Sequence, residues 1–121
     1  MPLKNEHLAR SQQNLQFARS FDLATTPYLD WVVTAYFYAA LHLVDALLDQ
    51  QDQIHPPDHK VRWEMVKGRY YLMGIKTEYR DLKEHSENAR CQLLTFTKPK
   101  IERDVIPLYE EIERHIKQQL K

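Results

Sequence analysis

The hydrophobic pattern is strongest over residues 27–49, where apolar side chains occupy nearly every angle around a helical axis. A helix that is apolar on all sides is surrounded by other elements, so this segment predicts a buried central helix. Thr26 is its candidate N-cap, and Pro27 suits the first helical position. The polar exceptions recur every three or four residues and therefore share one line of the helix: Asp30, Thr34, Tyr38, His42, Asp45 and Asp49.

Other segments show the helical period on one side only. A first helix is predicted over 4–21, a third from an Asp58 cap to Met73 with Gly74 as its stop, and a fourth over 77–94. In the last helix, Pro107 predicts either a kink or a true start near Asp104. The fourth segment has the most regular apolar seam, typical of nearly antiparallel helix packing: Ile75, Tyr79, Leu82, Ser86, Ala89 and Leu93.

These segments predict an all-α fold. We expect an up-and-down bundle of about five helices, with the second helix buried at its centre, in a single domain over residues 1–121. The chain has only two glycines, Gly68 and Gly74, which disfavours an architecture of strands and tight turns. Neither glycine lies in a Walker or Rossmann spacing, so the sequence excludes these phosphate-binding loops.

Charge and cysteine content narrow the class of protein. Because 17 basic residues balance 17 acidic ones, no global positive field favours long nucleic acids. Cys91 is the one cysteine, which excludes an intrachain disulfide and a cysteine-only zinc site and fits a reducing compartment. Residues 1–16 lack the apolar core of a signal peptide, and the charged positions of the second helix argue against a membrane span. We expect a soluble, cytoplasmic protein.

Two groups of residues carry a resemblance to a known family. The first lies in the first two helices: Asn14, Leu15, Ala18, Trp31 and the runs 36–42 (YFYAALH) and 43–48 (LVDALL). The second follows the double proline: His59, Arg62, the run 79–82 (YRDL), Ser86, Ala89 and Arg90. Across about the whole chain, these residues resemble the HEPN superfamily (higher eukaryotes and prokaryotes nucleotide-binding), most closely its short stand-alone prokaryotic members.

The resemblance implies a helical bundle that forms a homodimer and acts as a ribonuclease or ribonuclease toxin, often encoded beside a small nucleotidyltransferase. In that family an arginine, followed four to six residues later by a histidine near the start of a late helix, forms an active site paired across the dimer. Arg80 and His85 match this spacing. Asp81 stands where the family usually has asparagine, and Cys91 stands where a tyrosine is expected after Arg90.

Arg80 and His85 suit ribonuclease chemistry, because a histidine can take the proton of the ribose 2′-hydroxyl and a cation can stabilise the phosphorane. No metal is needed for that mechanism. Both residues flank the apolar seam of the fourth helix, beside the polar positions Asp81, Glu84 and Asn88, so a second subunit would close the site. The alternative interpretation is a solvated helix face with ordinary charges.

The polar line of the second helix contributes Tyr38, His42 and Asp45 to a second candidate binding site. His59 and Arg62, which follow the double proline, belong to the same candidate site. His42 is predicted to hydrogen-bond Asp45 or Tyr38, one turn away, and such a contact can tune a histidine. The site is then either a base or metal site, or a satisfied polar contact to a neighbouring helix or dimer partner.

His55 and His59 flank the sequence Pro56-Pro57-Asp58 and suggest metal binding together with His42 or Asp45. The prolines make this spacing non-helical, so no ligand geometry follows from it, and a capped loop explains the same residues. The chain also contains no Glu-x-x-His pair of the kind found in metal-carboxylate bundles. We therefore predict no metal and no cofactor.

The third helix alternates basic and aromatic residues, which suits contact with phosphates and bases but also ordinary packing: Lys60, Arg62, Trp63, Lys67, Arg69, Tyr70 and Tyr71. Packing is the stronger interpretation of this pattern, and it is the resemblance that predicts a homodimeric protein that binds RNA or a nucleotide, or cleaves RNA as a toxin. The alternative is a non-enzymatic interaction module that partners a nucleotidyltransferase or binds a nucleotide or small ligand.

Overall fold

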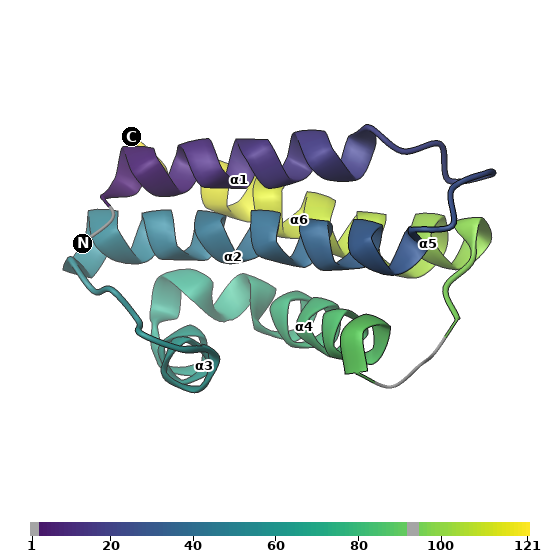
Figure 1. Cartoon of the computed structure of the whole chain (residues 1–121). Helices are drawn as coiled ribbons and strands as arrows, with labels where there is room; N and C mark the ends of the chain where they lie inside the picture. Colours follow the sequence, from purple (N-terminus) through teal and green to yellow (C-terminus); the bar gives the residue numbers. More distant parts are fainter. Residues whose placement is uncertain (1–2, 92–94) are drawn as a thin grey trace.

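A computed structural model describes residues 3–91 and 95–121, without the side chain of Cys91, and its regular elements are all helical (Figure 1). Their order is α1 (Lys4–Arg19), α2 (Leu29–Asp52), α3 (His59–Gly68), the 3₁₀ helix η1 (Tyr70–Ile75), α4 (Lys76–Cys91), α5 (Lys98–Asp104) and α6 (Ile106–Lys117). The long helices alternate in direction, so the predicted all-α bundle is confirmed.

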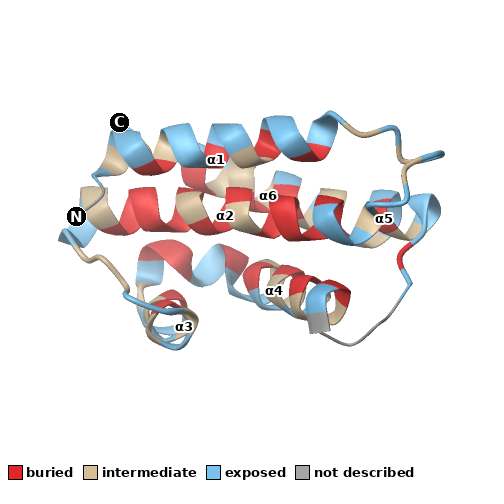
Figure 2. Cartoon of the chain, viewed as in Figure 1, coloured by how far each residue is buried: buried red, intermediate tan, exposed pale blue. Residues whose placement is uncertain are grey.

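Helix α2 is the centre of the bundle. It lies between α1 and α4, with α6 behind it, and its buried residues face all of these neighbours (Figures 1 and 2). By length and composition α2 could cross a membrane, but 83% of its apolar window is buried inside the bundle. This burial is what the core helix of a soluble protein shows, as the all-round apolar pattern predicts.

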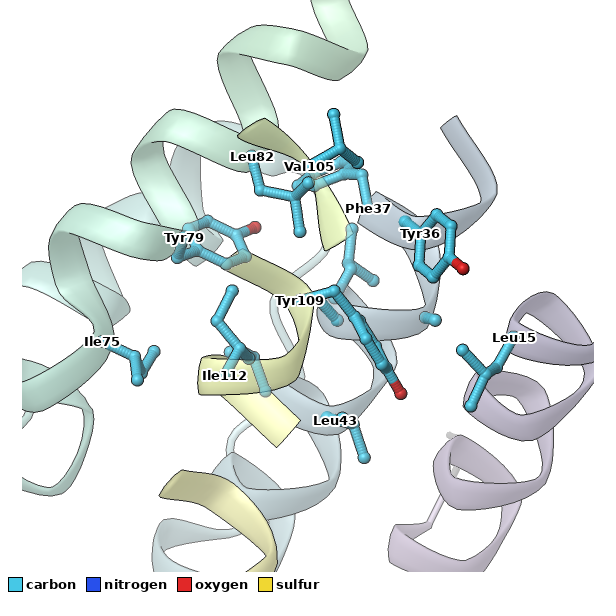
Figure 3. Packing of buried hydrophobic residues seen from close by; sticks show 14 of the residues in the cluster. Leu15, Tyr36, Phe37, Leu43, Ile75, Tyr79, Leu82, Val105, Tyr109 and Ile112 are labelled. Atoms are coloured by element: carbon cyan, nitrogen blue, oxygen red, sulfur yellow. The ribbon is translucent and has the colours of Figure 1, made fainter. Parts of the chain in front are cut away.

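The core forms where four helices converge (Figure 3). Leu15 of α1, Phe37 of α2, Tyr79 of α4 and Ile112 of α6 are all nearly inaccessible to solvent. Burying an apolar side chain of this size contributes about 1.5–3 kcal/mol. The predicted seam of α4 is buried at Ile75, Tyr79, Leu82, Ser86 and Ala89, while Leu93 lies outside the described residues.

The start of α2 differs from the sequence prediction. Thr26 does not cap the helix; its Oγ1 accepts a hydrogen bond from the Tyr28 backbone N–H at 3.1 Å, which forms a turn that holds Pro27 outside the helix. The helix begins at Leu29 and continues to Asp52, three residues beyond the predicted end. Gln53 then closes it in the left-handed region at φ 53°, the conformation that ends many helices.

Helix α3 begins as predicted, because the Asp58 carboxylate accepts a hydrogen bond from the Val61 backbone N–H at 2.9 Å. It ends at Gly68 rather than at Met73, since Arg69 is extended and the chain re-enters a separate 3₁₀ turn. Gly74 lies inside that turn and does not stop a helix. A Cβ at position 74 would lie 2.6 Å from the His115 ring, so this glycine provides space for a side chain of α6.

The C-terminal helix is interrupted, as Pro107 predicts. Thr97 caps α5 through a hydrogen bond from the Lys100 backbone N–H at 3.3 Å, and α5 ends at Asp104. Helix α6 restarts after Val105, with Pro107 in its first turn, where a missing N–H costs no helical bond. At the same end of the bundle, α1 stops at Arg19, two residues before its predicted end at residue 21.

Candidate functional site

Two histidines from different helices meet near the N-terminus of α1. His7 of α1 and His42 of α2 face each other with 3.1 Å between their Nδ1 atoms, so one ring donates a hydrogen bond and the other accepts it. His7 is 7% exposed and His42 is half-buried. Burial, followed by the neighbouring His7, lowers the pKa of His42 to about 4, and burial also lowers the pKa of His7. Both rings are therefore neutral at pH 7.

One turn along α2, Asp45 forms a buried ion pair with Arg62 of α3. The guanidinium donates two hydrogen bonds, from Nε to Oδ1 at 2.7 Å and from Nη2 to Oδ2 at 2.9 Å. The Asp45 side chain is 5% exposed and the Arg62 side chain is 9% exposed. Arg62 also reaches the Pro56 carbonyl oxygen at 3.4 Å. The pair therefore fixes α3 and the preceding loop against the C-terminal half of α2.

The loop after α2 completes this cluster with His55. Its Nε2 lies 3.3 Å from the Asp49 carboxylate, which also accepts a hydrogen bond from the Lys4 backbone N–H at 2.8 Å. The Nδ1 of His55 is buried and has no hydrogen-bond partner among the described residues. Together these residues line a surface hollow of about 400 Å³ at the end of the bundle where α1 begins: His7, Leu41, His42, Asp45, His55, Pro56, Pro57 and Arg62. We call this hollow the histidine pocket.

The other members of the second predicted site lie apart from the histidine pocket. Tyr38 accepts a hydrogen bond from Arg90 of α4 at 3.3 Å, and His59 lies beside it with 6.1 Å between ring centroids. Burial, and then the charge of Arg62, lower the pKa of His59, whose Nδ1 is buried without a partner in the described parts of the chain. The prediction that His42 bonds Asp45 or Tyr38 is wrong, because all three bind residues of other helices.

Arg80 and His85 line two different hollows, one on each side of a polar ridge of α4. Arg80 shares one of about 390 Å³ with Trp63 and Lys83, and its Nε lies 3.2 Å from Asp81. His85 shares the other, of about 400 Å³, with Arg103 and Asp104 of α5. Glu84 and Asn88 line both hollows and form the ridge between them: the polar face that the sequence predicts. Within one chain, the structure therefore does not bring Arg80 and His85 together.

Sequence reasoning missed His7, although it did associate His55 with His42 and Asp45, which line the same pocket. The α1 pattern gives His7 no distinctive neighbours, because its contact with His42 spans 35 residues of chain. A usable signal exists in hindsight: His7, Ser11, Leu15 and Ala18 share one face of α1, and all four are buried. A histidine on a buried face requires a polar partner, and the polar line of α2 supplies it.

The chemistry available in the histidine pocket is that of neutral imidazole donors beside an oriented carboxylate. The hollow of Trp63, Arg80 and Lys83 instead combines a flat aromatic ring with two cations. Comparison of the chain with protein-family models, with curated proteins and with solved structures gave no match.

Proposed function

We propose that this chain is a HEPN-like protein that binds RNA or a nucleotide in the groove between α3 and α4. The observation that carries the proposal is the hollow shared by Trp63, Arg80 and Lys83. Aromatic rings stack on bases, and guanidinium and ammonium groups bind phosphate, so this set offers both contacts that a nucleotide requires.

The indole of Trp63 is supported from behind. It stacks on Tyr79 with 11° between the ring planes and 6.4 Å between centroids, and Lys67 lies 5.7 Å from its ring. A side chain held in this way presents a rigid face at a low cost in conformational entropy. The partial exposure of Trp63 leaves part of its surface accessible to a base.

The cations of this hollow are held only by surface pairs. Arg80 is 55% exposed beside Asp81, and Lys83 pairs with Glu87 one turn away. Exposed pairs of this kind are weak, so a phosphate can replace the carboxylate. Glu84 and Glu87 also line the hollow, and their charges disfavour a long polyanion. This balance favours a mononucleotide or a short single strand over duplex RNA.

Titration with a short single-stranded RNA, followed by tryptophan fluorescence, tests the binding site. Because the chain has two tryptophans, Trp31→Phe leaves Trp63 as the one reporter. Saturable quenching that weakens tenfold or more in Arg80→Ala and weakens with added salt is the expected result. Arg114→Ala, which removes a similarly exposed arginine of α6, is the matched control and should bind normally. Unchanged fluorescence at low salt contradicts the proposal.

Cleavage requires more than one chain, because Arg80 and His85 face different hollows. In the nuclease form of the proposal, two copies form a homodimer and contribute Arg80 and His85 to one composite site. Light scattering should then give about twice 14.5 kDa. Expression should arrest growth with degradation of cellular RNA, and Arg80→Ala and His85→Ala should each abolish both effects. If the protein is a folded dimer and cellular RNA stays intact, the nuclease form is refuted and only the binding function remains.

A second candidate function is a non-enzymatic interaction module, for instance one that partners a nucleotidyltransferase. Exposed aromatic side chains on α1 and at the start of α2 favour it: Phe17, Tyr28 and Trp31 are 47%, 53% and 56% exposed. If a nucleotidyltransferase is encoded beside this gene, the two purified proteins should co-elute. Phe17→Ser with Trp31→Ser should abolish that complex and leave RNA binding at Trp63 intact.

A further inference from the structure

We infer that the histidine pocket binds a divalent transition-metal ion such as Zn²⁺, with His7, His42 and Asp45 as its protein ligands. One donor atom from each of the three side chains lies within 4.8 Å of the other two. The three come from two helices, with His42 and Asp45 on one face of α2 and His7 opposite them on α1. This inference is independent of RNA binding in the α3–α4 groove.

The two histidines already have the separation that a metal would impose. Zinc binds histidine nitrogen at about 2.0–2.1 Å, so two ligands at the corners of a tetrahedron lie about 3.3 Å apart. The Nδ1 atoms of His7 and His42 are 3.1 Å apart and point toward each other. To bind a metal ion between them, the donor ring must move its proton from Nδ1 to Nε2, and both rings must tilt so that their Nδ1 lone pairs converge on the ion.

The carboxylate of Asp45 is oriented by Arg62 of α3. Arg62 donates one hydrogen bond to each of its oxygens, and each oxygen keeps a further lone pair for a metal. Outer partners of this kind orient metal ligands in known sites. One of its oxygens lies within 4.8 Å of a nitrogen of each histidine, so small movements of the three side chains toward one another would let them share one ion.

The charges around the pocket suit a dication. Asp45 and Asp49 contribute two negative charges and Arg62 one positive charge, whereas the two facing imidazoles contribute none. Imidazole with a carboxylate selects zinc and its first-row neighbours over magnesium or calcium, which prefer oxygen ligands throughout. Three protein ligands leave a fourth position open, and His55, whose buried Nδ1 has no partner among the described residues, lines the same pocket.

Binding of CoCl₂ and ZnSO₄ to tag-free protein, stripped with a chelator and then dialysed, tests the inference. We expect one equivalent of each ion by calorimetry, and visible absorption of tetrahedral intensity for cobalt. His7→Ala and His42→Ala should each weaken binding tenfold or more. His85→Ala removes a histidine that lines a different hollow on α4, so it is the matched control and should bind normally.

Circular dichroism of each variant shows whether it folds. If both alanine variants unfold, zinc titration of the wild-type protein decides the question, because the side-chain NMR signals of two coupled histidines should shift together at one equivalent. Absence of stoichiometric binding by the wild type overturns the inference. So does binding that persists at full strength in folded His7→Ala and His42→Ala, since the ion would then lie elsewhere. In either case the histidine pair is a hydrogen bond that joins α1 to α2.

Discussion

Removing the Arg62 side chain should destabilise the protein more than any surface substitution. Arg62 and Asp45 form two short hydrogen bonds in an environment where neither side chain is more than 9% exposed. Arg62→Met keeps most of the side-chain volume but leaves the carboxylate buried and unpaired. Breaking a buried pair in this way costs about 3–5 kcal/mol, a large part of the 5–15 kcal/mol that stabilises a typical domain.

The expected loss can be converted into a melting temperature. A chain of 121 residues unfolds with an entropy of about 0.25 kcal/mol per kelvin, so the melting temperature should fall by about 12–20 °C. Thermal and urea unfolding, followed by circular dichroism in buffer with a chelator, measure this loss without interference from metal. Arg103→Met is the control, because Arg103 pairs with Asp104 in solvent and its loss should leave the melting temperature unchanged.

A double substitution separates the ion pair from the burial of its parts. Asp45→Leu with Arg62→Met removes both charges, and replacing a buried pair by apolar residues is often neutral or stabilising. The double variant should therefore be more stable than either single variant. A loss below about 1 kcal/mol in Arg62→Met, or strictly additive losses in the double variant, would refute the assignment of a dry, tightly coupled pair.

Three further predictions concern single positions. The pKa of His42 is lowered to about 4 in the folded protein from 6.5 in the unfolded chain, so the unfolded chain binds more protons and metal-free protein should lose stability as the pH falls from about 6.5 to 4. Because His42 is only half-buried, we expect a loss of about 1–2 kcal/mol. The variant His42→Gln should show a flatter pH dependence of the free energy of unfolding. Gly74→Ala should cost about 1–3 kcal/mol in urea unfolding, because its Cβ would lie 2.6 Å from the His115 ring, whereas Gly68→Ala has nothing within 4 Å and should cost nothing. Asp58→Ala removes the cap of α3 and should cost about 1 kcal/mol, and an unchanged unfolding midpoint would show that the cap does not form.

The fold could be predicted where local pattern and packing agree. The all-round apolar surface of α2 requires neighbours on every side, and the break before Pro107 follows from the missing N–H of proline. The prediction failed where tertiary contact decides the local structure. Glycine is the residue type that commonly ends a helix, but the role of Gly74 depends on His115. His115 is 41 residues away in the chain, so no local sequence pattern could predict this contact.

The candidate site could be predicted only in part, for the same reason. The periodicity of α2 correctly places His42 and Asp45 on one line, because that relation lies within a helix. Their partners come from other helices: His7 from α1 and Arg62 from α3. Spacing within one helix cannot identify such partners. The match of Arg80 and His85 to a spacing likewise says nothing about the Glu84 and Asn88 ridge that separates their hollows.

Helix α3 contributes to both proposed sites through adjacent residues. Arg62 holds the carboxylate of the histidine pocket, while Trp63 presents its indole to the groove beside α4. A helix of 10 residues has little stability of its own, so we expect α3, which the Arg62–Asp45 pair joins to α2, to open locally without unfolding of the bundle. Any ligand that requires α3 to be docked shifts this equilibrium. Occupancy of one site would therefore raise the affinity of the other by an equal factor in both directions, and slower amide exchange in α3 would report either event.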